Sequence, residues 1–133
     1  MKKEKLEILE EYLKSGITTI LLENIPATAF SDAIVLESSC SLEDLNGHYE
    51  GIEFLPPKWY SDLMNQSEKQ SPILIINNIN KVSNKEQTKF IEILKYKKVS
   101  TFELPKKCII ILLVTNLKEN KINEEVYSLV AHI

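Results

Sequence analysis

Two asparagines, Asn77 and Asn78, follow a run of four aliphatic residues at 73–76. Such a run is typical of a strand buried on both faces. A pair of acids at the end of such a strand would hold a divalent cation and activate water, but an amide carries no charge, binds magnesium weakly and cannot act as a general base. Because asparagine favours turns, the pair indicates a strand end where the chain changes direction.

Cysteine and histidine offer a second chemistry. Cys40 and Cys108, together with His48 and His132, are the residue types of a Cys–His nucleophile. Both cysteines adjoin apolar strands, which favours buried and unreactive thiols. Two cysteines are also too few for a disulfide framework, and no pair has the spacing of metal ligands.

Lysines offer a third possibility, the binding of phosphate groups. Six of them form a candidate nucleic-acid patch on and just before one predicted helix: Lys81, Lys85, Lys89, Lys95, Lys97 and Lys98. A solvated helix face explains the same pattern, and both readings stay open. All sixteen basic residues of the chain are lysines, so arginine, the residue best suited to bidentate phosphate contacts, is absent.

Composition sets the frame for these candidates. The chain has 133 residues, 44% of them hydrophobic and 26% charged, as in an ordinary globular domain. We therefore expect one domain over residues 1–133. The charged, amphipathic start is not that of a secretory signal, and the longest apolar run, 108–114, is too short to span a bilayer. A cytoplasmic protein without membrane contact is the expectation.

Hydrophobic periodicity predicts alternating helices and strands. Strands are expected at 17–23, 33–37, 72–77 and 109–115. Helices are expected at 3–15, 41–47, 58–66, 83–98 and 122–133, with capping patterns at 41–44 and 83–86. Buried strands that alternate with helices predict an α/β domain with a mostly parallel sheet.

The second half of the chain resembles the ATPase core of AAA+ proteins, in particular the MoxR and dynein-related branch of P-loop NTPases. The family's order is an aliphatic strand ending in two acids, a capped helix, a short hairpin and a strand ending in asparagine. Asn77 and Asn78 stand where the family has the acids, and Asn116 stands where it has the asparagine that orients water. Further matches are Ile79, Asn80, Lys81, Gln87, Leu104 and Pro105.

In the first half of the chain, residues 23–31 align with the segment that forms the phosphate loop in the same family. There Asn24 and Ala29 take the positions of two phosphate-loop glycines, Phe30 that of the lysine and Ser31 that of the hydroxyl. No glycine occurs between residues 17 and 46. A phosphate cradle needs converging N–H groups in conformations that glycine adopts at little cost. The helix that would follow this loop is expected to be missing.

The resemblance thus implies a three-layer α/β/α sandwich, a truncated P-loop NTPase core without the C-terminal helical lid. The implied strand order is first-fourth-third-second, with a fifth strand stunted or absent and the first strand at the sheet edge. With phosphate loop, acids, arginine finger and lid all lost, we expect no enzyme and no cofactor. The expected function is a protein-interaction module that self-associates or docks on an AAA+ ring subunit. The alternatives are a residual nucleotide binder or weak ATPase, and a nucleic-acid accessory protein that uses the lysine patch.

Overall fold

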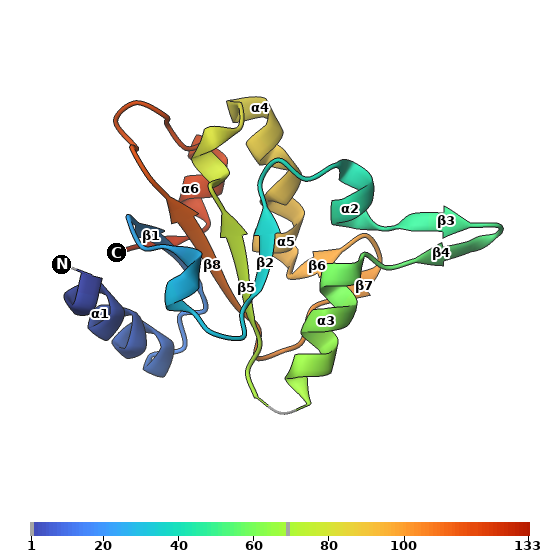
Figure 1. Cartoon of the computed structure of the whole chain (residues 1–133), viewed down its shortest axis with the longest axis horizontal. Helices are drawn as coiled ribbons and strands as arrows, with labels where there is room; N and C mark the ends of the chain where they lie inside the picture. The colour runs from blue at the N-terminus through green and yellow to red at the C-terminus, as the bar shows by residue number, and fades with distance from the viewer. Residues whose placement is uncertain (1, 69) are drawn as a thin grey trace.

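The computed structural model describes residues 2–68 and 70–133. At its centre lies a five-stranded sheet in which all neighbouring strands run parallel (Figure 1). The order across the sheet is β2-β5-β8-β1-β9. Its members are β1 (Thr19–Glu23), β2 (Ile34–Glu37), β5 (Ile73–Asn77), β8 (Ile109–Val114) and β9 (Ala131–His132). The domain is therefore α/β, as the alternation of buried strands and helices predicts.

The four strands predicted from apolar runs all form, each shifted by no more than two residues at its ends. Their observed order, β1-β8-β5-β2, is the order expected. The central strands β5 and β8 each lie between two neighbours, and residues such as Ile75 and Ile111 are fully buried. Burial on both faces explains why these strands are continuous apolar runs in the sequence.

The expectation that the first strand forms an edge of the sheet is wrong. The two-residue strand β9 pairs with Ile20 and Leu21 of β1, and the N–H of Ile133 donates to the carbonyl of Leu21 at 3.0 Å. Residues 122–133 therefore do not form one helix. Only α6 (Glu124–Ser128) is helical, and the chain then turns back to satisfy part of the free edge of β1.

One face of the sheet carries the larger hydrophobic core. Residues such as Leu74, Ile110 and Leu112 of the strands pack there against Trp59, Leu63, Phe90 and Val126 of the helices. The helices that contribute to this core are α2 (Leu42–Asn46), α3 (Lys58–Ser67), α5 (Ile91–Tyr96) and α6. The predicted caps at Ser41 and Ser83 are confirmed, since each hydroxyl accepts an N–H from the residue three positions later.

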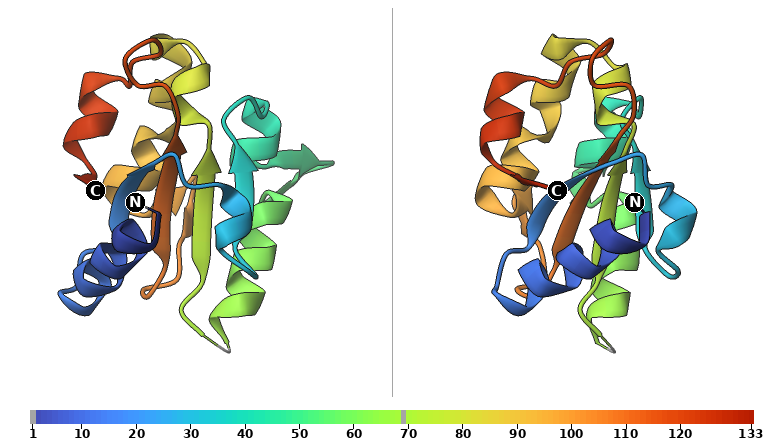
Figure 2. Two further views of the ribbon diagram at one scale, coloured as in Figure 1. Left: turned by 60° about the vertical axis from the view of Figure 1, so that its left-hand side comes forward. Right: turned by 90° about the vertical axis from the view of Figure 1, so that its left-hand side faces the viewer.

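The opposite face is covered by α1 (Lys2–Lys14) and by the connection from β1 to β2, which holds a single 3₁₀ turn, η1 (Ala27–Ala29). Leu9 of α1 packs on Ile20, Ile75 and Ile111 of the sheet. Figure 2 shows α1 and this connection on one side of the sheet, with α5 and α6 on the other. The sheet thus has helical cover on both faces.

The helix predicted over 83–98 is not continuous. The structure divides it into α4 (Asn84–Gln87), the 3₁₀ turn η3 (Thr88–Phe90) and α5. The Thr88 hydroxyl donates to the carbonyl of Lys85, a local bond that competes with regular helix geometry, and the tighter turn buries Phe90 completely. Another 3₁₀ turn, η2 (Ile79–Lys81), joins β5 to this region.

Two antiparallel hairpins complete the fold. The first, β3 (His48–Glu50) with β4 (Glu53–Leu55), projects from the body of the domain (Figure 1) and was not predicted. The second, β6 (Lys98–Val99) with β7 (Phe102–Glu103), is the short hairpin that the family resemblance implies before the strand at 109. In the described part of the chain, no helix is both long and apolar enough to cross a membrane.

Candidate functional site

The carboxyl-terminal ends of β1, β5 and β8 lie side by side and border a pocket of about 370 Å³. The connection after β1 packs on the α1 face, whereas the chain after β8 packs on the opposite face. Such a reversal is the place where open α/β sheets hold their ligands. The pocket is lined by Asn24, Ile25, Pro26, Asn77, Asn78, Leu113, Val114 and Thr115.

Three of the predicted site residues adopt left-handed backbone conformations close to these strand ends. The φ angles of Asn24, Asn78 and Asn116 are 59°, 58° and 55°. Asparagine tolerates this region better than other residues with a Cβ. The carbonyl of Asn116 also accepts N–H groups from Glu119 and Asn120, at 3.0 and 2.9 Å. The turn predicted after the strand at 73–77 is therefore confirmed at Asn78.

The segment matched to a phosphate loop uses its N–H groups inside the protein. The Asn24 N–H donates to the Val114 carbonyl at 2.9 Å. The Ala29 N–H donates to the carbonyl of Pro26, the N-cap of η1, at 3.0 Å, and the Phe30 N–H donates to the carbonyl of Ala27 at 3.1 Å. Phe30 packs on the α1 side of the core, and Ser31 is exposed. These N–H groups do not point to a common centre, and no α-helix lies between β1 and β2, a stretch that is described throughout.

The amide of Asn77 ties β5 to the edge strand β2. Its Nδ2 donates to Oε2 of Glu37 at 2.9 Å. Beside it, the Ser38 N–H donates to the Asn77 carbonyl and the Ser38 hydroxyl donates to the Asn78 carbonyl, at 3.1 and 2.7 Å. An aspartate at position 77 would face Glu37 with a like charge. The neutral amide at the strand end thus has a structural reason within this fold.

Two buried amides hold the loop that follows β8. Asn80 is 3% exposed, and its Nδ2 donates to the carbonyls of Thr115 and Asn120 at 2.6 and 2.8 Å. Gln87 donates to the carbonyls of Val82 and Lys121 and accepts the N–H of Asn123. Both residues also stand at positions that match the family resemblance. In this structure, their side chains support the loop that follows β8.

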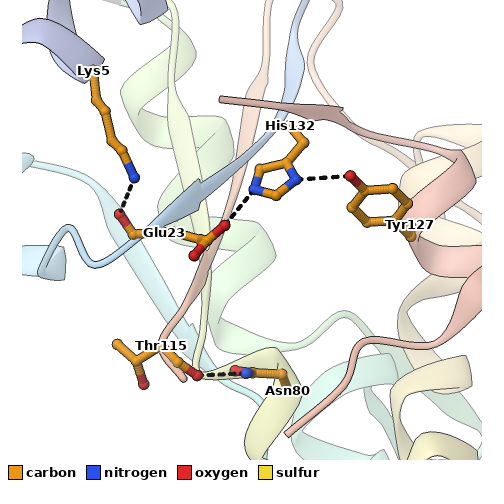
Figure 3. A network of polar contacts seen from close by, with 6 residues as sticks. All are labelled: Lys5, Glu23, Asn80, Thr115, Tyr127 and His132. Carbon is orange, nitrogen blue, oxygen red and sulfur yellow. Dashed lines mark hydrogen bonds and ion pairs between the residues drawn. The ribbon is translucent and has the colours of Figure 1, made fainter. Parts of the chain in front are cut away.

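A chain of three polar side chains, not predicted from the sequence, lies beside this edge (Figure 3). Oε1 of Glu23 is 2.7 Å from Nε2 of His132, and Nδ1 of His132 is 2.8 Å from the hydroxyl of Tyr127. A carboxylate accepts hydrogen bonds, so Nε2 carries a proton, and in a neutral ring Nδ1 then accepts the Tyr127 proton. Lys5 donates to the backbone carbonyl of Glu23 at 3.1 Å. Only the pairing of β9 with β1 brings these residues together, and no spacing in the sequence indicates it.

His132 and Tyr127 also border a largely apolar pocket of about 370 Å³, whose other lining residues are Leu117, Lys121, Ile122 and Glu124. The side chains of His132 and Glu23 are 28% and 30% exposed. The arrangement fixes the imidazole from both sides and attaches the last strand to β1. The His132 ring has the geometry to relay a proton between the Tyr127 hydroxyl and the Glu23 carboxylate. The observed contacts are already sufficient for a structural role.

The Cys–His hypothesis finds no geometric support among the contacts observed. His132 contacts Glu23 and Tyr127, and Nε2 of His48 lies 3.9 Å from Oε1 of Glu50. Burial raises the pKa of the Cys108 thiol to about 12, and desolvation also raises the pKa of the Cys40 thiol. Both sulfurs therefore stay protonated near neutral pH, and a thiol is a poor nucleophile compared with a thiolate.

The six lysines of the candidate nucleic-acid patch do not lie on one helix. Lys81 precedes the helix cap at Ser83, and Lys85 belongs to α4. Lys89 donates to the carbonyl of Cys40 at 2.7 Å, and Lys97 donates to the hydroxyl of Thr19. Lys95 and Lys98 are exposed. Two members of the proposed patch are thus held by bonds within the protein.

Comparisons with known proteins assign no family to this chain. Neither protein-family models nor curated proteins give a match. Any functional assignment therefore depends on the contacts and surfaces described above.

Proposed function

We propose that this chain is a non-catalytic protein-interaction module built on an AAA+-like P-loop NTPase scaffold. The observation that supports an interaction role is the projecting hairpin β3–β4, which carries Ile52 at its tip. Ile52 is fully exposed and Tyr49 is 70% exposed. Apolar side chains on a projecting element are typical of a contact with another protein.

The hairpin has the properties of a preformed binding element. The rings of Tyr49 and Phe54 pack edge to face with centroids 4.9 Å apart, and Phe54 stacks on Phe102 of the second hairpin at 6.0 Å. This ladder of rings connects the projecting strands to the body, which lowers the entropy lost on binding. Glu50 and Glu53 flank the tip and are exposed. The complementary surface is an apolar pocket with a basic rim.

The scaffold half of the proposal is supported by topology. The order β1-β8-β5-β2 is the one that the resemblance implies, and the short β9 is added beyond β1. The polar groups at the family's nucleotide positions are engaged within this protein: Asn77 with Glu37, and the N–H groups of Asn24, Ala29 and Phe30 with carbonyls. We therefore propose that the module works without nucleotide, metal or other cofactor. Its partner is an AAA+ ring subunit or a second copy of the chain.

The interaction is tested at the hairpin tip. A photo-crosslinking amino acid at position 52 should give a discrete crosslink in cells, identified by mass spectrometry as a second copy or as an AAA+ ring subunit. Binding to that species, measured with purified proteins, should be lost in Ile52→Ser. The matched control is Leu42→Ser, which removes another exposed apolar side chain, 62% accessible, in α2 and outside the hairpin. Equal binding by Ile52→Ser and the wild type would overturn the proposal.

The non-catalytic half has a separate test. A ligand that binds the native state raises the melting temperature, by an amount that grows with the logarithm of its concentration divided by its dissociation constant. Millimolar ATP with magnesium should leave the melting temperature unchanged. A magnesium-dependent rise would mean that residues 24–31 and 77–78 still hold a nucleotide, and would favour a residual nucleotide-binding function.

A further inference from the structure

Another pocket lies at the amino-terminal ends of β1 and β8, opposite the strand ends that border the first pocket. Its volume is about 280 Å³. The lining combines an amine, a thiol and apolar walls: Thr18, Tyr96, Lys97, Glu103, Leu104, Pro105, Lys106 and Cys108. The proposed interaction role does not involve this pocket.

Lys97 occupies an unusual backbone position in this pocket. It ends α5 in the left-handed region, with φ 56° and ψ 42°, where glycine or asparagine is usual. Its N–H donates to the Ile93 carbonyl at 3.1 Å, and its own carbonyl accepts the N–H of Leu104 at 2.9 Å. Both backbone groups are thus fixed by hydrogen bonds, and the side-chain amine donates to the hydroxyl of Thr19.

The surroundings of the Lys97 amine favour its neutral form. The residue is half-buried, and desolvation lowers the pKa of its ammonium group. The nearby Cys108 thiol opposes this only in part, because burial raises the pKa of that thiol to about 12 and keeps it uncharged. The hydroxyl of Thr19 is a neutral partner. A neutral amine is the nucleophilic form of lysine.

We propose that Lys97 is a nucleophilic amine that forms an imine with a small aliphatic aldehyde bound in this pocket. The walls from Leu104, Pro105 and the Tyr96 ring suit a short hydrocarbon chain. The exposed charges of Glu103 and Lys106 at the same pocket are opposite in sign and select no charged group. The volume of about 280 Å³ lies just below the range of pockets that hold drug-sized ligands, so the ligand is a small molecule.

The chemistry needs no additional oxidant or reductant. The lone pair of Nζ attacks the carbonyl carbon, and the electrons of the C=O π bond move to oxygen, which takes up a proton. The nitrogen loses a proton to give a carbinolamine, and loss of water then forms the C=N bond. The sum is amine plus aldehyde giving imine plus water. Thr19, which accepts an N–H of the amine, is a positioning residue in this scheme.

Reductive trapping tests the proposal on the full chain. Butanal and sodium cyanoborohydride at pH 7 convert any imine to a stable butyl-lysine, which peptide mass spectrometry locates. Lys97 should be labelled severalfold faster than the exposed neighbours Lys95 and Lys98. Labelling of Lys97 at the same rate or more slowly would overturn the proposal, because the burial would then only shield a structural amine.

Two comparisons separate ligand binding from simple amine reactivity. Formaldehyde fills no hydrocarbon pocket, so its preference for Lys97 should be smaller than that of butanal; an equal preference would overturn the binding step. Lys97→Arg keeps a long cationic side chain and should abolish the selective butyl adduct, whereas the matched Lys98→Arg should retain it. Far-ultraviolet circular dichroism of both variants checks that each is folded. A selective adduct that persists elsewhere in Lys97→Arg would also contradict the assignment.

Discussion

Glu23 and His132 are 109 positions apart in the chain, yet Oε1 of Glu23 lies 2.7 Å from Nε2 of His132. Glu23 ends β1 and His132 lies in β9, a strand of only two residues. Backbone pairing over two residues provides few hydrogen bonds, and the side-chain contact adds a further attachment between the two strands. The Tyr127 hydroxyl, 2.8 Å from Nδ1, fixes the ring from its other side. Both side-chain and backbone contacts therefore hold β9 against β1.

Removing this attachment should loosen the last strand. We expect Glu23→Gln to lower the free energy of unfolding by about 1 kcal/mol at pH 7, the usual size for a partly exposed charge-assisted hydrogen bond. Hydrogen exchange of amides in β9 should accelerate. The control is Glu50→Gln, which alters the other carboxylate–histidine pair, 3.9 Å long, with the Glu50 side chain 72% exposed. Equal effects of the two substitutions would show that the Glu23 contact has no special role.

The strand end at position 77 gives a prediction about charge. Asn77→Asp would place a carboxylate against Oε2 of Glu37, which now accepts the Asn77 amide at 2.9 Å. We expect a loss of about 1–2 kcal/mol at pH 7 from the lost hydrogen bond and the new repulsion, and a smaller loss at pH 3 where carboxylates are protonated. Urea denaturation at the two pH values measures both.

A second substitution isolates the cause of that loss. In the double variant Asn77→Asp with Glu37→Gln, the amide and carboxylate exchange places and most of the stability should return. Failure of the double variant to recover stability would mean that position 77 requires asparagine for its backbone rather than for its charge. The stability of the double variant also shows whether this fold tolerates an acid at position 77 without a bound metal.

The sequence predicts the sheet well because its strands are apolar on both faces, and that pattern depends little on distant contacts. It also predicts the strand end at Asn77 and the turn at Asn78, because asparagine has a local preference for such positions. It does not reveal the break in the helix at Thr88, since that break depends on one side-chain bond and the burial of Phe90. The Glu23–His132 contact is beyond sequence reasoning for a related reason. Two residues of strand have no detectable period, and the pair exists only once the sheet is assembled.

Cys108 predicts how stability depends on alkaline pH. Its thiol has a pKa near 9.0 when exposed and about 12 in the folded protein. Between these values the folded state keeps a proton that the unfolded state loses, so this group makes stability fall as pH rises through that window. By pH 11 its contribution is a loss of roughly 2–3 kcal/mol relative to pH 8. Equilibrium unfolding of wild type and Cys108→Ala should therefore converge as pH rises.

The neighbouring amine acts in the opposite direction over part of that range. Desolvation lowers the pKa of Lys97 in the folded state from 10.5, so the unfolded chain binds more protons just below that value, and stability from this group rises with pH there. Comparing Lys97→Met with the wild type separates the two contributions. Cys40→Ala is the control for the thiol, since Cys40 is only half-buried and its alkaline effect should be smaller. An unchanged alkaline slope in Cys108→Ala would refute the assignment to Cys108.

Gly47, immediately before the projecting hairpin, and Gly51, in its turn, have different constraints and give a matched pair of substitutions. A Cβ added at Gly47 would lie 2.3 Å from the carbonyl oxygen of Leu55, at φ 96°, whereas one at Gly51 would meet no atom within 4 Å. Gly47→Ala must therefore shift the base of the hairpin, and we expect it to cost about 2–3 kcal/mol, against about 1 kcal/mol for Gly51→Ala from backbone conformation alone.

The same pair connects stability to the proposed interaction. Because a Cβ at Gly47 would displace Leu55 at the base of the hairpin, Gly47→Ala should weaken binding of the partner even at temperatures where the variant remains folded. Gly51→Ala lies beside Ile52 but leaves the base of the hairpin intact, and it should bind within severalfold of the wild type. Thermal melts and binding to the species crosslinked at position 52 measure the two effects separately. Normal binding by a folded Gly47→Ala protein would show that the orientation of the hairpin is not what the partner recognises.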